Sequence, residues 1–236
     1  ILMGYKPKDF DIATNATPEQ VRSIFKKSRI IGRRFRLVHV IYGREIIEVS
    51  TFRAKPLQKI QMSNGVLKDN EFGSIEEDAE RRDFTINALY YDVENKNLID
   101  FYGGLKDIQD NKLRLIGEPK LRYKEDPIRI LRAIRFSAKL KMKIHSETLN
   151  EIRNSMGLLQ SVPYSRLFDE VMKFFFTGHS QESMVLFKKY NLSNLYFPSL
   201  ENDNKIFNDF LLQALINTDL RIKNGQSINP GFLLAV

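Results

Sequence analysis

Two aspartates near the start of the chain stand on either side of one phenylalanine. The stretch KPKDFDIAT places Asp9 and Asp11 two residues apart. On a strand these positions project to the same face, so the two carboxylates lie together and Phe10 is expected on the opposite side, toward the core. Aligned carboxylates repel each other, and a divalent cation with oxygen ligands removes that cost. The pair predicts a metal site, although a D-x-D pattern also arises by chance in strands and turns.

A third carboxylate, Glu48, stands in the middle of the apolar stretch REIIEVSTFR. Because Ile47 and Val49 must face one way on a strand, Glu48 faces the other. A solvated edge strand would account for this position, and so would a third acidic group of the same site. Three carboxylates near a basic surface favour two-metal phosphoryl or nucleotidyl transfer. One ion then lowers the pKa of an attacking hydroxyl and the other neutralises the leaving phosphates.

The positive charge of the protein is concentrated in one segment. The 236 residues carry a formal net charge of +8, and the window from residue 20 to residue 44 contains eight lysines and arginines but no acid. Such a local field attracts polyanions, above all phosphates, while a solvated basic face would contain the same residues. The absence of cysteine excludes disulfides and thiolate metal sites, and three scattered histidines argue against zinc. No apolar run reaches the ~20 residues that span a bilayer.

The elements that must position these groups follow from periodicity and from helix-start signals. A strand is predicted over residues 9–14. A helix follows over TPEQVRSIFKKS, where Thr17 is the N-cap and Gln20 completes a capping box. Two strands on either side of Gly43 are predicted to form a hairpin. Residues 54–74, which are polar and interrupted by proline and glycine, are predicted to form a long mobile loop.

Beyond this loop the pattern changes once more. Ser74 and Glu77 predict a second capping box at the start of a helix, and INALYYDV predicts a strand after it. Further short strands are interrupted at Gly103–Gly104. After Gly117 the apolar residues recur with helical period. The chain is therefore predicted to be an α+β protein, with an α/β head followed by an all-helical part.

Five motifs connect the chain to a known family. They are, in order, KPKDFDIAT, EVSTFR, RRDFTINALYYD, DFYGGLKDI and RYKEDPIRILRAIRF. Together they resemble the bacterial nucleotidyltransferases that act on RNA 3′ ends, the family of poly(A) polymerases and CCA-adding enzymes (class II). The likeness covers most of the chain, and the tail NTDLRIKNGQSINPGFLLAV matches more weakly. Within the family, IIGRRFRLVHV is similar to the stretch typical of poly(A) polymerases.

The resemblance implies three parts. Residues 1–117 would form a catalytic nucleotidyltransferase head with a mixed sheet. Residues 118–175 would form a helical neck that recognises the base, and residues 176–236 the start of a helical, RNA-binding body. Relatives usually have a further strand and a phosphate-binding segment before KPKDFD and a longer helical body after it, so the chain is expected to be a fragment truncated at both ends.

The resemblance also implies roles for individual residues. Asp9 and Asp11 would be the catalytic Mg²⁺ ligands, and Glu48 the third carboxylate, which helps to activate the RNA 3′-hydroxyl. The residues implied to hold the sugar and phosphates of the nucleotide are Arg82, Asp83 and Asn87. The residues expected to contact phosphate of RNA or nucleotide are Arg33, Arg34, Arg36, Arg132 and Arg135. Without the family, Arg82 and Asp83 would be interpreted as surface charges of a helix.

Asp126 and Arg129 form a pattern of their own. They stand three residues apart and so share one face of a helix. A carboxylate accepts from an exocyclic amine and a guanidinium donates to the adjacent ring nitrogen, an edge that adenine and cytosine share. The pair would admit ATP or CTP and reject GTP or UTP. Alternatively, Asp126 is a good N-cap and Pro127 a good first helical residue, with no role in recognition.

The resemblance predicts a template-independent enzyme of the bacterial cytoplasm that adds AMP from ATP to RNA 3′ ends and releases pyrophosphate. Its expected partners are ATP, the RNA 3′ end and the RNA-degradation machinery, with no membrane. The alternatives are a CCA-adding or A-adding enzyme for tRNA, a catalytically silent RNA-binding protein on the same scaffold, and a purely helical adaptor. Incorporation of CTP on a tRNA that lacks its end would identify the first of these.

Overall fold

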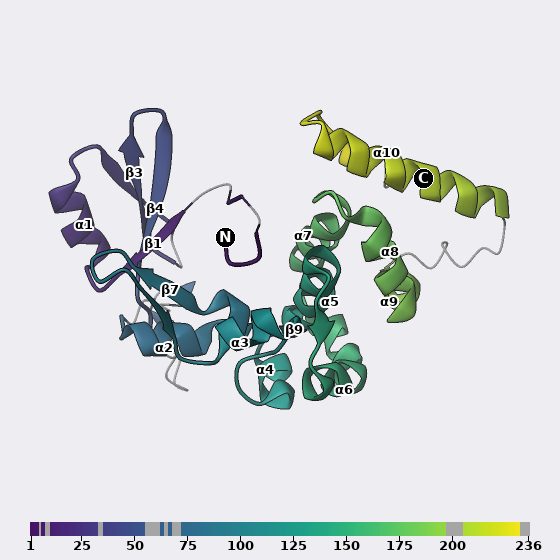
Figure 1. Ribbon diagram of the computed structural model, residues 1–236, viewed down its shortest axis with the longest axis horizontal. Coiled ribbons are helices and arrows are strands. Elements are labelled where there is room, and N and C mark those ends of the chain that lie inside the picture. Colours follow the sequence, from purple (N-terminus) through teal and green to yellow (C-terminus); the bar gives the residue numbers. More distant parts are fainter. Residues whose placement is uncertain are drawn as a thin grey trace. The chain divides into compact units, whose positions relative to one another are not determined.

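The chain folds into two compact units, residues 1–108 and residues 109–236, which are described separately (Figure 1). The structure is a computed structural model. It describes residues 1–4, 6–7, 10–32, 35–54, 62–63, 66–67, 72–196 and 205–231. Asp9, Arg33 and Arg34, together with most of the loop predicted over residues 54–74, lie outside the described residues.

The first unit is built around a four-stranded mixed sheet of order β1-β4-β3-β2, in which β1 runs parallel to β4 and the other pairs are antiparallel. Its first elements are β1 (Asp11–Thr14), α1 (Pro18–Ile24), β2 (Ser28–Ile31), β3 (Leu37–Tyr42) and β4 (Glu45–Thr51). The elements that follow are β5 (Met62–Ser63), β6 (Val66–Leu67), α2 (Ile75–Arg81), the 3-10 turn η1 (Thr85–Asn87), β7 (Leu89–Asp92), β8 (Asn97–Asp100) and α3 (Gly104–Gln109).

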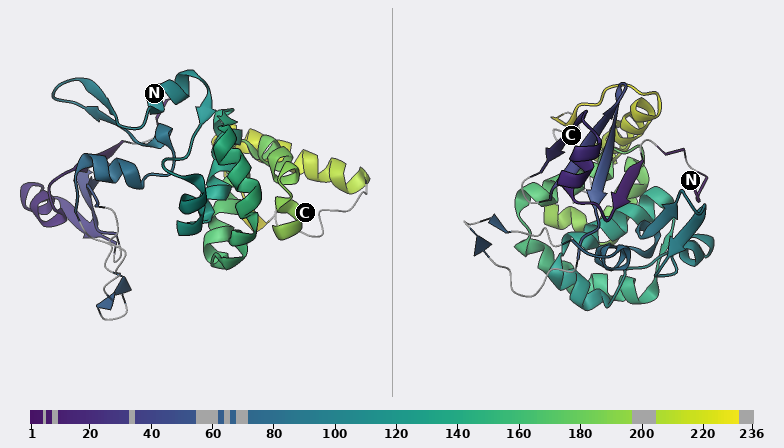
Figure 2. Two further views of the ribbon diagram at one scale, coloured as in Figure 1. Left: turned by 90° about the horizontal axis from the view of Figure 1, so that it is seen from below. Right: turned by 90° about the vertical axis from the view of Figure 1, so that its left-hand side faces the viewer.

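Helix α1 covers one face of this sheet, as the views in Figures 1 and 2 agree. Its start is the predicted capping box, because the Thr17 hydroxyl accepts from the amide of Gln20 and the Gln20 side chain accepts from the amide of Thr17. The apolar residues that the helix and sheet bury against each other are Val21, Val38, Val40 and Val49. The opposite face of the sheet carries both polar side chains and exposed apolar ones such as Ile41 and Ile46.

The second half of this unit is joined to the end of β4. The second predicted capping box, Ser74 with Glu77, starts α2. Strands β7 and β8 pair antiparallel, and the Asp100 carboxylate at the end of β8 accepts from the amides that begin α3. Gly104 must be glycine, since a Cβ there would lie 2.3 Å from the Thr85 carbonyl oxygen.

In its described residues, the second unit is helical apart from one parallel two-residue pairing of β9 with β10. Its elements are β9 (Lys112–Leu113), α4 (Pro119–Glu125), α5 (Ile128–Leu140), β10 (Lys143–Ile144), α6 (Ser146–Ser155), η2 (Met156–Ser161), α7 (Tyr164–Phe175), α8 (Ser180–Lys189), α9 (Leu192–Tyr196) and α10 (Lys205–Lys223). Helix α5 packs against α7 and α8, and Phe174 and Phe187 meet edge to face in the core between them, with ring centroids 5.2 Å apart.

The structure differs from the sequence-based expectations in several places. Strand β2, helices α3 and α4 and strand β10 were not predicted, whereas β9 lies in the stretch before Gly117 where a further strand was expected. Because β10 lies after Gly117, the part expected to be all-helical is not wholly helical. Phe10 does not point into the core: it is 69% exposed, because it precedes the first residue of β1, the edge strand of the sheet. Within the described part of the chain, none of the helices combines the length and the apolar composition that crossing a bilayer requires.

Candidate active site

Two of the three predicted carboxylates lie side by side. Asp11 of β1 is the register partner of Glu48 of β4, and the two strands are parallel. Register partners on neighbouring strands project to the same face of a sheet. Val49 is in the core on the α1 side, so Glu48 and Asp11 project from the opposite face, as the alternation in β4 predicted. Asp9 lies outside the described residues.

The row of side chains continues across the whole sheet. His39 of β3 is the register partner of Glu48, and Arg29 of β2 is the register partner of His39. The His39 Nε2 atom lies 3.2 Å from Glu48 Oε1. Two carboxylates, an imidazole and a guanidinium therefore stand in one line on the face away from α1. Sequence reasoning missed His39, because the sequence around a histidine in an apolar strand does not indicate which residue its side chain will contact.

The carboxylates suit a hard divalent cation, whose preferred ligands are oxygens. Among the described residues no three histidine, aspartate or glutamate side chains gather into a metal-holding group. Asp11 is exposed at the start of β1, and the Glu48 side chain is about half exposed at 52%. Both carboxylates are thus accessible to a cation and to a phosphate-bearing substrate.

The three residues expected to hold the nucleotide follow α2 directly. Arg82 is the C-cap of the helix, while Asp83 is 9% exposed and so is not a surface helix charge. The Asp83 carboxylate accepts from the Asn87 side-chain amide at 3.0 Å and from the Phe84 backbone amide at 2.9 Å. Asp83 and Asn87 are therefore held against each other, whereas Arg82 turns to a different partner.

That partner is Asp78, a buried carboxylate of α2. It accepts from Arg82 Nη2 at 3.0 Å, from the Tyr90 hydroxyl at 2.7 Å and from the Arg53 backbone amide at 3.2 Å. Burial acts to raise the pKa of Asp78, but the hydrogen bond from Tyr90 and the charge of Arg82 outweigh it, so the pKa lies below its ordinary value. Burial and the same hydrogen bond raise the pKa of Tyr90 to about 12. The network fixes Arg82 beside the end of β4.

In the helical unit, the side chains of Asp126 and Arg129 are not paired with each other, although the Arg129 backbone amide donates to the Asp126 carbonyl oxygen at 3.1 Å. Asp126 lies in the break between α4 and α5, where its Oδ2 accepts from Arg166 Nη2 at 2.9 Å. Arg129, in the first turn of α5, donates to Glu125 at 3.0 Å and to the Arg122 carbonyl oxygen at 2.8 Å. Each member of the predicted base-reading pair is thus oriented by its own partner, and sequence reasoning identified neither partner.

The remaining predicted arginines differ in accessibility. Arg36 is half-exposed and forms an ion pair with Glu19. Arg132 is partly exposed, with Nη1 3.8 Å from Glu170 and its guanidinium 5.3 Å from the centre of the Phe136 ring. Arg135 was expected to touch phosphate, but it is buried and donates to Glu170 at 3.1 Å, so that expectation is wrong. Its position on α5 faces α7 instead of solvent.

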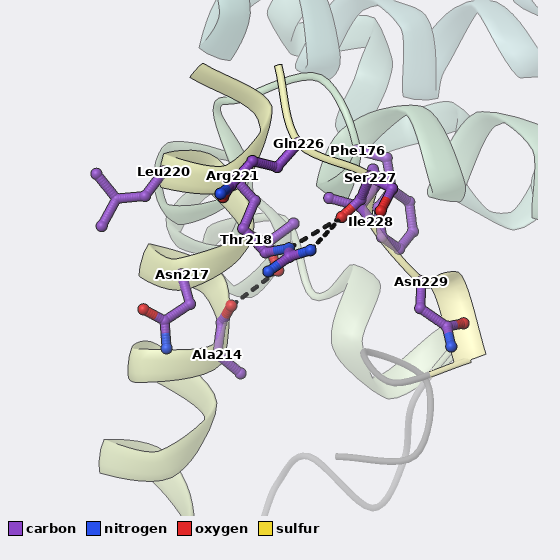
Figure 3. Close-up of a pocket in the computed structure, with 10 residues that line it drawn as sticks. All are labelled: Phe176, Ala214, Asn217, Thr218, Leu220, Arg221, Gln226, Ser227, Ile228 and Asn229. Atoms are coloured by element: carbon purple, nitrogen blue, oxygen red, sulfur yellow. Dashed lines mark hydrogen bonds between the residues drawn. The ribbon is translucent and has the colours of Figure 1, made fainter. Parts of the chain in front are cut away.

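A cavity of about 560 Å³ is lined by none of these groups (Figure 3). It lies in the helical unit beside the last turns of α10. Arg221 reaches across it, and its Nε and Nη2 donate to the carbonyl oxygen of Ser227 at 2.9 and 2.7 Å. The arginine is used to fold the chain end back onto α10, and the cavity adds nothing to the predicted chemistry.

A mixed sheet with carboxylates on the face away from α1, followed by a helical unit, agrees with the nucleotidyltransferase fold of the structural relatives given below. Residues 1–114 match the family model for the poly A polymerase head domain, and residues 141–204 match the model named "Probable RNA and SrmB-binding site of polymerase A". The chain belongs to the family that comprises the bacterial poly(A) polymerases and the CCA-adding enzymes.

Individual relatives agree with this assignment. Poly(A) polymerase I of Escherichia coli O6:H1 is 48% identical over all of this chain and 53% of its own length. The crystal structure of the CCA-adding enzyme of Bacillus stearothermophilus with CTP is 32% identical, with a TM-score of 0.71 over 91% of this chain and 50% of that one. A tRNA nucleotidyltransferase complexed with a primer tRNA and an incoming ATP analog is 25% identical, with a TM-score of 0.75 over 96% and 65%. The chain spans about half the length of the curated poly(A) polymerase.

Proposed function

We propose that the protein containing this chain is a template-independent RNA nucleotidyltransferase that adds AMP from ATP to RNA 3′ ends. The observation that carries the proposal is the register pairing of Asp11 with Glu48 on one open face of the sheet. The higher identity to a poly(A) polymerase than to a CCA-adding enzyme, 48% over all of this chain against 35% over 86% of it, supports adenylation. The alternative is CCA addition to tRNA. It is retained because the two structural relatives are a CCA-adding enzyme and a tRNA nucleotidyltransferase.

In this reaction the RNA 3′-oxygen forms a bond to the α-phosphorus of ATP, and the bond from that phosphorus to the β-phosphate oxygen breaks. The hydroxyl proton is lost and pyrophosphate leaves. Asp9 and Asp11 would hold Mg²⁺, which when bound activates the hydroxyl and neutralises phosphate charge. Glu48 faces the same side and accepts the proton of the hydroxyl or orients it.

The nucleotide would be held by groups whose chemistry suits its parts. Asp83 and Asn87, already held together, offer oxygen and amide groups to the ribose hydroxyls. Arg82 offers a guanidinium to phosphate oxygens. Asp126 and Arg129 would read the amine and the adjacent ring nitrogen of the base. This edge is common to adenine and cytosine, so the pair alone leaves the choice between ATP and CTP to its surroundings.

The parts of the chain would divide the work. Residues 1–117 form the catalytic head, residues 118–175 read the base, and residues 176–236 begin the RNA-binding body. Arg33, Arg34 and the half-exposed Arg36 would contact RNA phosphate, and Arg132 phosphate of RNA or nucleotide. Contacts of this kind release counterions, so RNA affinity is expected to fall steeply as salt rises. The proposal includes mRNA processing in the bacterial cytoplasm, together with the RNA-degradation machinery.

The test is an extension assay with the full-length protein, in which each of the four nucleoside triphosphates is offered separately with and without Mg²⁺. The acceptors are an unstructured RNA and a tRNA that lacks its CCA end. Addition of A to the unstructured RNA with ATP and Mg²⁺ supports the proposal. No addition of A would refute it, and addition of C to the tRNA would establish the alternative.

A second experiment addresses the catalytically silent RNA-binding protein. Asp11→Asn keeps the shape of the side chain and removes its charge. We expect it to cost at least about 2.7 kcal/mol of transition-state stabilisation, a loss of about 100-fold or more in rate. Glu45→Gln is the matched control, because Glu45 is an exposed acid at the hairpin end of β4. If Asp11→Asn leaves the rate unchanged, the carboxylate has no catalytic role.

A further inference from the structure

We propose that His39 is a positioning residue for Glu48: its imidazole anchors one oxygen of the carboxylate on the sheet face that Asp11 shares, and so restricts the rotamers from which Glu48 acts on the RNA 3′-hydroxyl. The inference rests on the proposed function and adds a residue to it. The contact that carries it is the 3.2 Å separation of His39 Nε2 from Glu48 Oε1 between register partners on β3 and β4.

The direction of the hydrogen bond follows from the chemistry of the two groups. An ionised carboxylate only accepts hydrogen bonds, so the ring nitrogen at 3.2 Å must be the donor. The other ring nitrogen, Nδ1, is buried and makes no hydrogen bond to the described residues. A proton on Nδ1 would leave a buried N–H without an acceptor, whereas a proton on Nε2 has Glu48. The neutral tautomer with Nε2–H is therefore the favoured one.

The imidazole is better fixed than the carboxylate that it holds. The His39 side chain is 16% exposed and the Glu48 side chain 52% exposed. A glutamate has three rotatable side-chain bonds, and a half-exposed one would otherwise occupy several rotamers. Anchoring Oε1 to a nearly buried ring on β3 selects among them. The contact uses Oε1 and so leaves Oε2 for the substrate hydroxyl.

The neighbouring charges set the direction in which Glu48 is drawn. Arg29 is the register partner of His39 on the side away from Glu48, and Asp11 is the register partner of Glu48 on the other side. Asp11 repels the Glu48 carboxylate, and the positive Arg29 attracts it. Without the imidazole between them, the carboxylate would be drawn away from Asp11 toward Arg29. The register places His39 between these two charges, where its imidazole donates a hydrogen bond to Glu48 from a fixed position.

The test compares two substitutions of His39 in the full-length protein. In His39→Gln the side-chain amide nitrogen reaches a position comparable to Nε2 and can donate to Glu48. In His39→Leu the bulk remains but the donor is lost. We expect the leucine variant to lose about 10-fold or more in kcat with the KM for ATP unchanged, since groups that orient a catalytic side chain typically contribute 10- to 100-fold. The glutamine variant should retain most of the kcat.

A purely structural role would give a different pattern. Cross-strand pairs stabilise sheets modestly, so both variants would then lose a similar amount of thermal stability. The kcat of each variant would not depend on whether its side chain can donate a hydrogen bond to Glu48. Equal kcat for the leucine variant and the unaltered protein, or an equal loss in both variants, would overturn the inference. The Tm of each variant, measured in parallel, confirms that the compared proteins are folded.

A double variant separates this inference from the proposed function. If His39 acts through Glu48, adding His39→Leu to Glu48→Gln should cause no further loss of kcat, because the two residues act as one unit. A further 10-fold loss in the double variant would refute the positioning role. If the unaltered protein fails to add AMP at all, the proposed function fails instead. Glu45→Gln serves again as the control for loss of a β4 carboxylate.

Discussion

Neutralising Glu170 of α7 is expected to destabilise the helical unit severely. The side chain is buried, and three cations converge on its carboxylate. Arg135 Nε lies 3.1 Å away, Lys173 Nζ 2.8 Å away and Arg132 Nη1 3.8 Å away. Arg135 is itself buried, with its guanidinium 4.5 Å from the centre of the Phe136 ring. Glu170→Gln keeps the size of the side chain and removes the negative charge among these cations.

The magnitude follows from burial. Removing one partner of a buried ion pair costs roughly 3–5 kcal/mol, because the remaining charge stays out of water. Glutamine can still accept a hydrogen bond from Arg135, which places the expected loss near the lower limit, about 3 kcal/mol. Unfolding entropy is roughly 2.1 cal/mol/K per residue, or about 0.27 kcal/mol/K for a unit of about 130 residues. The loss corresponds to a fall of about 11 °C in the Tm of this unit.

Differential scanning calorimetry of the full-length protein measures this shift. Asp169→Asn is the matched control: Asp169 neighbours Glu170 on α7 but is exposed, so its charge should matter by less than about 1 kcal/mol. Replacing both Arg135 and Glu170 by methionine should recover much of the lost stability, because two apolar side chains leave neither of these buried positions with an unpaired charge. A fall of less than about 3 °C for Glu170→Gln would refute the reasoning.

Three further results are expected. Gly104→Ala should cost at least about 2 kcal/mol in urea unfolding, because the new Cβ would lie 2.3 Å from the Thr85 carbonyl oxygen, a backbone atom that cannot turn aside. Since the pKa of Tyr90 is raised from 10.0 to about 12, its contribution to stability is complete below pH 10 and is lost as the pH rises toward 12. Tyr90→Phe should abolish that part of the alkaline loss in a pH series of denaturation midpoints. Arg166→Ala removes the 2.9 Å ion pair to Asp126 and should raise the KM for ATP while shifting Tm little, since the pair is partly exposed.

Local features of this chain could be predicted well from sequence. The capping boxes at Thr17 and at Ser74 involve residues only three positions apart, and both form as predicted. The hairpin around Gly43 forms because a glycine there adopts a positive φ of 63°. The outward direction of Glu48 followed from the alternation of its apolar neighbours. In each case the interacting groups belong to one element or one turn, so their spacing in sequence determines their geometry.

Contacts between distant residues could not be predicted in this way. Asp126 meets Arg166 across 40 residues, and Arg135 meets Glu170 across 35. No periodicity distinguishes an arginine that binds phosphate from one that neutralises a buried glutamate, since both stand on an amphipathic helix. Phe10 was assigned to the core on alternation alone, but an edge position leaves it exposed. In these cases the position and role of a side chain depend on residues from other helices and strands.

The core of the head and its candidate site are specified by the same strand register. Val38 and Val49 are register partners in the core beneath α1, and His39 and Glu48, one residue along each strand in opposite directions, are register partners on the other face. A slip of one residue would turn the valines outward and the charged groups inward. The hydrophobic energy that selects the pairing of β3 with β4 therefore also aligns Glu48 with His39. Substitutions that loosen this pairing should reduce activity before the unit unfolds, because the site depends on register whereas much of the apolar burial does not.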